Sequence, residues 1–165
     1  MTKRTMIIAE AGVNHNGNLN LAKKLIDAAA SSGADVVKFQ NYKTELLIQK
    51  ELDGKKIGLR NYRPQKVYDL LKKYEFNYSD FQKLKKYSIK KKIIFAATPF
   101  DKKSVDELQK LKVPFFKISS GDVNNFQLIE YIVKKKKPII LSTGRCNLDE
   151  VTKTVSFLKK LKCKN

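Results

Sequence analysis

Two lysines stand inside short apolar runs, where a charged side chain is costly to bury without a partner. Lys38 lies in the run VVKF, and Lys117 lies in the run FFKI. A single lysine of this kind could simply pair with a structural carboxylate. Two of them near strand ends that share a pocket favour an anion site, because an opposed charge pair at ~4 Å and an effective dielectric of about 20 is worth roughly 4 kcal/mol before desolvation. The pattern indicates a site for a phosphate or a carboxylate.

Hydroxyl and carboxylate side chains occur at similar places in the sequence. Ser120 lies in a Ser-Ser-Gly triplet and Ser142 begins a Ser-Thr-Gly triplet, and small residues let a phosphate approach backbone N–H groups. Each triplet alone is equally typical of a turn. Glu10 ends the first apolar run and Asp122 follows Ser120 by two residues. Either carboxylate could instead be the partner that keeps a lysine neutralised.

Five short apolar runs of this chain end in such polar clusters. The runs begin at Ile7, Val36, Ile93, Phe115 and Ile139, and helical patterns separate them. Short apolar runs in this setting are typical of buried parallel strands. Ligands of such α/β folds bind at the carboxyl ends of the strands. We therefore expect one shared pocket that suits a small anionic substrate.

Two further polar residues fall at the strand ends. Alternation along a strand places Gln40 on the same side as Lys38, and Thr98 ends the third run. The helices between the strands have recognisable first residues. The expected caps are Asn18 or Asn20, Ser79, Asp101, Asn124 or Asn125, and Asn147 with Glu150 in a capping box, and Pro64 fits the first turn of a further helix.

The stretch from residue 41 to residue 61 has weak periodicity and is predicted to be an extended loop. A loop of that length in a compact domain is usually functional, and after the second strand of a barrel it would lie over the pocket. Five βα units fit an open parallel sheet as well as the first five units of an eight-stranded barrel. The local pattern does not choose between these two architectures.

His15 is the only histidine, which rules out a self-contained multi-histidine metal site. We expect it to pack or cap locally. Cys146 and Cys163 are too few and wrongly spaced for a disulfide framework or a zinc site. Residues 1–10 lack a secretory signal, and no apolar stretch approaches the ~20 residues of a membrane span. These observations predict a cytoplasmic protein.

The charge of the chain is strongly basic, at +19 over 165 residues, a length that suits one domain. Only four of the 35 basic residues are arginine, whereas base readout and bidentate phosphate binding favour arginine. No nucleic-acid-binding motif accompanies the charge. A lysine-rich solvated outer face is the preferred interpretation. The competing hypothesis, which is not enzymatic, is a basic protein that binds nucleic acid or another polyanion.

Five sequence blocks together resemble the sialic acid synthase family, which includes N-acetylneuraminate, legionaminate and pseudaminate synthases. The blocks are IAEAGVNHNG (8–17), GADVVKFQ (33–40), ATPFD (97–101), KISSGD (117–122) and KPIILSTG (137–144). They occur in order and cover nearly the whole chain. Another phosphoenolpyruvate-condensing barrel enzyme is the alternative among enzymes.

The resemblance implies an α/β fold of the TIM-barrel type, of which residues 1–165 would form the N-terminal part with about five of the eight βα units. The last three strands and a C-terminal antifreeze-like domain would be absent. The implied reaction condenses phosphoenolpyruvate with an N-acylated hexosamine such as N-acetylmannosamine, and it yields a nonulosonic (sialic) acid and phosphate. The resemblance implies a homodimer for the full-length form, and a half-barrel that works with a complementary chain is a further hypothesis.

The family also implies a divalent metal, manganese or magnesium, that orients the aldehyde of the sugar. Its two histidine ligands would lie in the absent part, so no metal ligand is assigned in this chain and the isolated chain is expected to be inactive.

The resemblance also implies roles for eight residues. They are Glu10, Lys38 and Lys117 as catalytic groups, and Gln40, Thr98, Ser120, Asp122 and Ser142 as substrate-binding groups. By position, Lys117 and the two serines would hold the phosphate, and Gln40 would meet the sugar. Two positions depart from the family pattern: Asp122 stands where many members have glutamate, and Arg145 stands where methionine is common.

Overall fold

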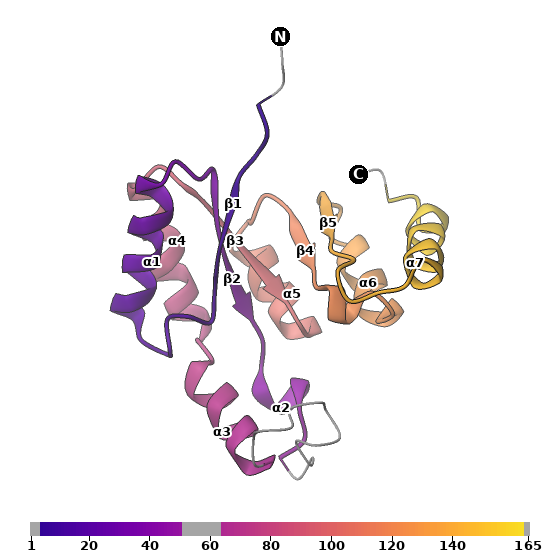
Figure 1. The fold of residues 1–165 in the computed structure, drawn as a ribbon, viewed down its shortest axis with the longest axis horizontal. Helices are drawn as coiled ribbons and strands as arrows, with labels where there is room; N and C mark the ends of the chain where they lie inside the picture. Colours follow the sequence, from indigo (N-terminus) through magenta and orange to yellow (C-terminus); the bar gives the residue numbers. More distant parts are fainter. Residues whose placement is uncertain (1–3, 51–63, 164–165) are drawn as a thin grey trace.

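Parallel strands alternate with helices along the chain, as the apolar runs predicted (Figure 1). The computed structural model describes residues 4–50 and 64–163. The strands are β1 (Ile8–Gly12), β2 (Val36–Asn41), β3 (Ile94–Pro99), β4 (Phe116–Ile118) and β5 (Ile139–Leu141). The helices are α1 (Leu19–Ser31), α2 (Thr44–Leu47), α3 (Pro64–Tyr74), α4 (Tyr78–Lys90), α5 (Lys102–Lys110), α6 (Phe126–Val133) and α7 (Leu148–Lys160), with a 3-10 turn, η1, at Ser120–Asp122.

The strands run parallel and lie side by side in chain order. Ladder hydrogen bonds join β1 to β2 and β2 to β3, and a second ladder joins β4 to β5. β4 lies next to β3, so the two ladders continue one another (Figure 1). The prediction of an α/β fold with parallel strands is confirmed. All the carboxyl ends of the strands therefore point to the same edge.

The main hydrophobic core lies between the strands and the helices. α1 buries Ala22, Ile26 and Ala29, which recur at helical spacing, and Phe39 of β2 is fully buried in the same cluster. Complete burial of such side chains contributes about 1.5–3 kcal/mol each. A smaller apolar cluster contains Val36, Ala96 and Phe115, with Ile8 and Ile140 packed against it. It occupies the face of the strands that also carries Lys38 and Lys117.

Most of the expected caps are present. The side chains of Asn18, Asp101 and Asn125 accept backbone hydrogen bonds at the first turns of α1, α5 and α6. Asn147 and Glu150 form the capping box of α7 that the sequence predicts.

Two local predictions were wrong. α4 is capped by Asn77 and not by Ser79, because the Asn77 side chain accepts from the N–H of Asp80 at 3.0 Å while Ser79 already lies in the first turn. The stretch predicted as an extended loop contains α2 at Thr44–Leu47. The rest of that predicted loop, from residue 51 to residue 61, lies outside the described residues.

Helix ends are closed by residues in the left-handed backbone region. After α1 this residue is Gly33, with φ of +75°. After α4, α5, α6 and α7 it is a lysine, namely Lys92, Lys112, Lys136 and Lys162, with φ between 52° and 56°. A side chain in this conformation costs about 1 kcal/mol, whereas glycine adopts it freely.

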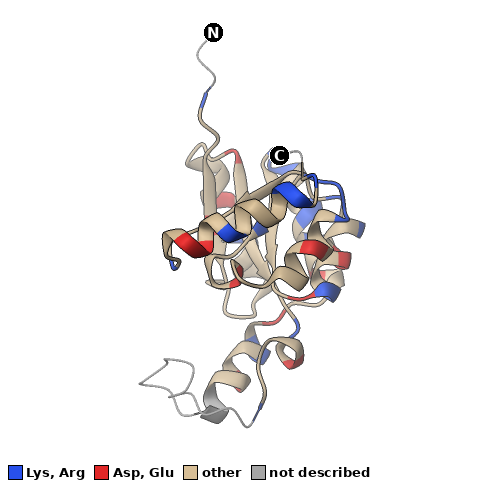
Figure 2. Cartoon of the chain, turned by 90° about the vertical axis from the view of Figure 1, so that its right-hand side faces the viewer, with Lys and Arg blue, Asp and Glu red and all other residues tan. Residues whose placement is uncertain are grey.

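Lysine and arginine residues are spread over the helices and turns that surround the strands, with aspartate and glutamate residues among them (Figure 2). This distribution agrees with a solvated outer face. In the part of the chain that the structure describes, none of the helices combines the length and the apolar character that crossing a bilayer requires.

Candidate functional site

A cavity of about 190 Å³ lies at the carboxyl ends of the strands. It is lined by Glu10, Lys38, Gln40, Thr98, Phe100, Lys117, Ser119, Ser120 and Ser142. These residues come from all five strands or from the turns directly after them. Every site residue that the sequence singles out lines this cavity except Asp122.

The strand register explains why the first group of these residues meets. Glu10 lies opposite Lys38, and Gln40 lies opposite Thr98. Lys38 is only 7% exposed, and its Nζ forms an ion pair with Glu10 Oε2 and donates to Thr98 Oγ1 at 3.2 Å. The Glu10 side chain is 52% exposed, so its carboxylate keeps contact with solvent.

Lys117 approaches the same cavity from β4. Its Nζ donates to the carbonyl oxygen of Ile118 at 2.8 Å and to the Oγ of Ser142, the residue directly after β5. Burial lowers the pKa of Lys117, the charge of Lys38 lowers it further, and the carboxylate of Glu10 acts in the opposite direction. The cavity thus holds two ammonium groups against one carboxylate. A bound anion would neutralise the excess positive charge.

The turns after β4 and β5 offer serine hydroxyl groups to a ligand, but two of their backbone N–H groups are already hydrogen-bonded. The N–H of Gly121 donates to Ser119 Oγ at 3.2 Å, and the N–H of Ser142 donates to the carbonyl oxygen of Ile118 at 3.2 Å. These two expected backbone donors are therefore already used inside the protein. The lysines and the serine hydroxyls remain the main groups for holding an anion.

Asp122 lies in η1, two residues after Ser120, and does not line the cavity. Asn125 Nδ2 donates to Asp122 Oδ1 at 3.3 Å. Burial raises the pKa of Asp122, and this hydrogen bond partly opposes that effect. Its carboxyl group is not part of the cavity wall.

Phe100 and Ser119 line the cavity although the sequence did not single them out. Phe100 follows Thr98 by two residues, so strand alternation was the available signal. Its N–H donates to the carbonyl oxygen of Asn41 at 3.0 Å, which ties the end of β3 to the end of β2.

His15 is part of the core, in agreement with the expectation that it packs locally. It is 1% exposed and stacks on Phe76 with ring centroids 4.0 Å apart. Its Nδ1 accepts a hydrogen bond from the N–H of Gly17 at 3.1 Å. Burial lowers the pKa of His15 to about 4, so the ring is neutral at physiological pH.

The donor set of the cavity does not fit a divalent metal on its own. Its one carboxylate, Glu10, is already paired with Lys38. Within residues 4–50 and 64–163, no group of three or more histidine, cysteine, aspartate and glutamate side chains is arranged to hold a metal ion. A metal would need ligands from outside the described residues.

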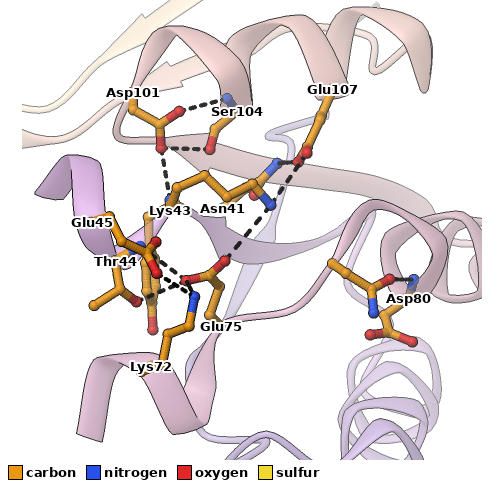
Figure 3. Close-up of polar contacts among 12 residues, drawn as sticks. Asn41, Lys43, Thr44, Glu45, Lys72, Glu75, Asp80, Asp101, Ser104 and Glu107 are labelled. Atoms are coloured by element: carbon orange, nitrogen blue, oxygen red, sulfur yellow. Dashed lines mark hydrogen bonds and ion pairs between the residues drawn. The ribbon is translucent and has the colours of Figure 1, made fainter. Parts of the chain in front are cut away.

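A second polar cluster lies on the other side of the end of β2, because Asn41 alternates with Gln40 (Figure 3). We call it the outer network; its members are Asn41, Lys43, Thr44, Glu75, Asp101, Ser104 and Glu107. Asn41 Nδ2 donates to Glu107 Oε2 at 3.1 Å, and Lys43 Nζ lies 3.2 Å from Glu107 Oε1 and 4.0 Å from Glu75 Oε1.

Backbone groups bind the same carboxylates (Figure 3). Asp101 accepts from the N–H of Lys43 at 2.8 Å and from the N–H and hydroxyl of Ser104. Glu75 accepts from both the N–H and the hydroxyl of Thr44. The outer network therefore joins α2, α3 and α5 to the ends of β2 and β3.

A larger groove, of about 640 Å³, lies near the opposite edge of the strands, where Pro138 precedes β5. Its wall consists of apolar residues such as Val133 and Leu161 together with exposed lysines. Its one carboxylate, Glu130, is paired with Lys134. Because it lacks convergent polar groups, the smaller cavity is the better candidate site.

Comparison with known proteins identifies relatives of the whole chain. The model of the NeuB family matches residues 25–165. The N,N'-diacetyllegionaminic acid synthase of Campylobacter jejuni is 43% identical over 164 residues, which are 99% of this chain and 48% of that enzyme. The N-acetylneuraminate-9-phosphate synthase of Homo sapiens is 36% identical over 94% of this chain and 43% of that enzyme.

A comparison with solved structures finds the same class of enzyme. The sialic acid synthetase of Leptospira borgpetersenii, in complex with citrate, superposes with a TM-score of 0.82 at 38% identity, over 97% of this chain and 52% of that one. The chain spans about half the length of the curated relatives that it matches. On the family match and on these identities, the chain belongs to the NeuB family of sialic acid synthase-type enzymes.

Proposed function

We propose that the cavity binds the phosphate and carboxylate of phosphoenolpyruvate, and that the protein condenses this substrate with an N-acylated hexosamine to give a nonulosonic acid and phosphate. The observation that carries the proposal is the pair of lysines, Lys38 and Lys117, in one cavity with a single carboxylate. Membership of the NeuB family supports the reaction class. The citrate in the related synthetase is a polycarboxylate anion, in keeping with an anion-binding protein.

Each residue of the cavity has a role in this proposal. Lys117 and the hydroxyls of Ser120 and Ser142 hold the phosphate. Lys38, which already donates to Thr98, lies near the carboxylate of the substrate. These groups hold the enol in place while its reaction partner approaches.

Gln40 and Glu10 face the second substrate in the proposal. The Gln40 amide hydrogen-bonds to the sugar, and Glu10 holds or accepts a proton during the reaction. Asp122 assists from beside the cavity and not from its wall. Cytoplasmic phosphoenolpyruvate is the expected source of the anion.

The proposed reaction forms one carbon–carbon bond and one carbon–oxygen bond, and it breaks the carbon–oxygen bond to phosphate. C3 of the enol attacks the aldehyde carbon of the open-chain sugar, water adds at C2, and phosphate leaves from C2 with its bridging oxygen. The aldehyde oxygen takes up the proton that the attacking water loses, and the proton of the resulting C2 hydroxyl goes to the departing phosphate as C2 becomes a ketone. No step is assigned to a metal, because the donor set of the cavity does not fit one.

The five βα units are, in this proposal, the first five of an eight-unit barrel. The remaining three strands and the antifreeze-like domain complete the sugar site in the family architecture. The isolated chain then binds phosphoenolpyruvate and does not turn it over.

Isothermal titration calorimetry tests the binding site. Phosphoenolpyruvate is titrated into the 165-residue chain, and its affinity is measured. We expect Lys117→Met to weaken binding by roughly tenfold or more, because a hydrogen bond to a charged group is worth about 1.5–3 kcal/mol. Lys159→Met removes an exposed lysine of α7 and serves as the matched control. Equal affinities in the two variants would contradict the proposed site.

A chimera tests the reaction. This chain is fused to the remaining half of the Campylobacter jejuni synthase, and phosphate release is measured with manganese and a set of N-acylated hexosamines. We expect turnover that requires both phosphoenolpyruvate and one of the sugars. A folded chimera that releases no phosphate, beside an active parent enzyme, would overturn the assignment.

A further inference from the structure

The end of β1 contains an irregularity next to the cavity. Glu10 lies opposite Lys38, but Gly12 lies opposite Phe39, so Ala11 is an extra residue in β1. This two-against-one register is a β-bulge, a device that bends a strand and redirects its side chains. Gly12 has a φ of +54°, in the left-handed region.

The space around Gly12 is occupied by two side chains of the cavity wall. A Cβ atom at this position would lie 3.3 Å from Glu10 Oε1 and 3.8 Å from Gln40 Nε2. The first distance is shorter than most real Cβ contacts, so the Glu10 carboxylate would have to move by a few tenths of an ångström. That carboxylate is the group that pairs with Lys38.

The geometry points to Gly12 as a positioning residue of the cavity: its missing side chain gives the Glu10 carboxylate the room to lie beside Lys38. The inference rests on the proposed function, since it takes Glu10 and Gln40 as members of that site. A side chain at position 12 acts on the cavity through Glu10.

A glycine at positive φ can also be required by the backbone alone, and Gly33 provides the comparison. Its φ is +75°, and a Cβ atom there would meet nothing within 4 Å. Gly33→Ala thus introduces backbone strain without a new contact. Gly12→Ala introduces comparable strain together with the contact to Glu10.

The experiment compares Gly12→Ala, Gly33→Ala, Glu10→Ala and the double variant of positions 10 and 12 in the 165-residue chain. The measured quantity is the pKa of Lys117. It is obtained by NMR of labelled lysine side chains over a pH titration without substrate. We expect Gly12→Ala to lower the pKa of Lys117, because the displaced Glu10 carboxylate raises it less. Gly33→Ala leaves it unchanged, and Gly12→Ala has no further effect once Glu10 is alanine.

Thermal unfolding gives a second measurement. We expect both glycine variants to lower Tm, and the Glu10→Ala background to reduce the Tm loss of Gly12→Ala to that of Gly33→Ala. If Gly12→Ala alone does not fold, recovery of a folded double variant supports the inference. A double variant that stays unfolded while Gly33→Ala folds would overturn it.

Equal Lys117 titrations in Gly12→Ala and Gly33→Ala would also overturn the inference, as would an effect of Gly12→Ala that persists without Glu10. Because the titration uses no substrate, these outcomes are independent of whether phosphoenolpyruvate binds. If only the proposed function is wrong, the Lys117 titrations of the variants will follow the expected pattern, but the parent chain will not bind phosphoenolpyruvate.

Discussion

The cavity and the outer network both place lysines beside carboxylates at the end of β2, but they balance charge differently. In the outer network, Lys43 faces Glu75 and Glu107, which are also bound by amide, hydroxyl and backbone donors. In the cavity, Lys38 and Lys117 share one half-exposed carboxylate. In the outer network the carboxylates outnumber the lysines and protein donors bind each of them, so this cluster is structural, whereas the excess lysine at the open cavity suits a ligand.

The largest expected effect separates the two lysines. Lys43→Met should lower the free energy of unfolding by about 3–5 kcal/mol, because it leaves the buried Glu107 carboxylate without a cation, while Glu75 keeps its ion pair with Lys72. Lys38→Met should cost no more than about 1 kcal/mol, since the remaining Glu10 carboxylate is half-exposed. Urea denaturation measures both, and equal losses would remove the distinction between the clusters.

His15 extends the comparison to a buried group with no charged partner. Its native pKa of about 4 lies below the usual 6.5, so the unfolded state binds the proton first as the pH falls. Stability should therefore fall by up to about 3 kcal/mol between pH 6.5 and pH 4. His15→Phe keeps a ring against Phe76 and cannot titrate, and its stability should change less over this pH range in urea denaturation. Parallel curves for the two proteins would show that burial does not lower the pKa of His15.

Removing the charge of Glu107 in the outer network and of Glu10 in the cavity should affect stability differently. Glu107→Gln should cost about 1–2 kcal/mol, because Asn41 and Lys43 lose part of a shared acceptor. Glu10→Gln should change stability little and tighten the binding of inorganic phosphate by roughly threefold, the worth of a unit charge about 7 Å away in water. Calorimetry with phosphate checks the second effect. Weaker binding by Glu10→Gln would mean that Glu10 supports the anion rather than opposes it.

The smallest effect concerns the pH dependence that Lys117 contributes. Burial lowers the pKa of this lysine, so the unfolded state binds more protons as the pH approaches the ordinary lysine value of 10.5. Its unfavourable contribution is fully present below its native pKa and disappears as the pH rises from there through the ordinary value of 10.5. Lys117→Met should be slightly more stable than the parent at pH 7, and the difference should vanish near pH 11. A parent that is the more stable one at pH 7 would refute this reading.

Strand alternation predicted most of the cavity, and long-range contacts account for the rest. Gln40 and Thr98 follow from their positions in apolar runs, because parallel strands bring their carboxyl ends together. The partnership of Lys43 with Glu75 and Glu107 could not be read from the sequence, since the three residues lie on different elements. Gly12 was the available local signal for the bulge at Ala11, because a glycine inside a strand pattern often marks a bulge.

The four lysines that close α4, α5, α6 and α7 in the left-handed region show that the chain is less stable than its own fold allows. Glycine at Lys92, Lys112, Lys136 and Lys162 would relieve about 1 kcal/mol of strain at each turn, less any gain in chain entropy on unfolding. Together these changes would also reduce the net charge by four from +19. None of these four lysines lines the cavity. The four substitutions can therefore give a more stable protein for crystallisation or solution work without changing the residues of the cavity wall.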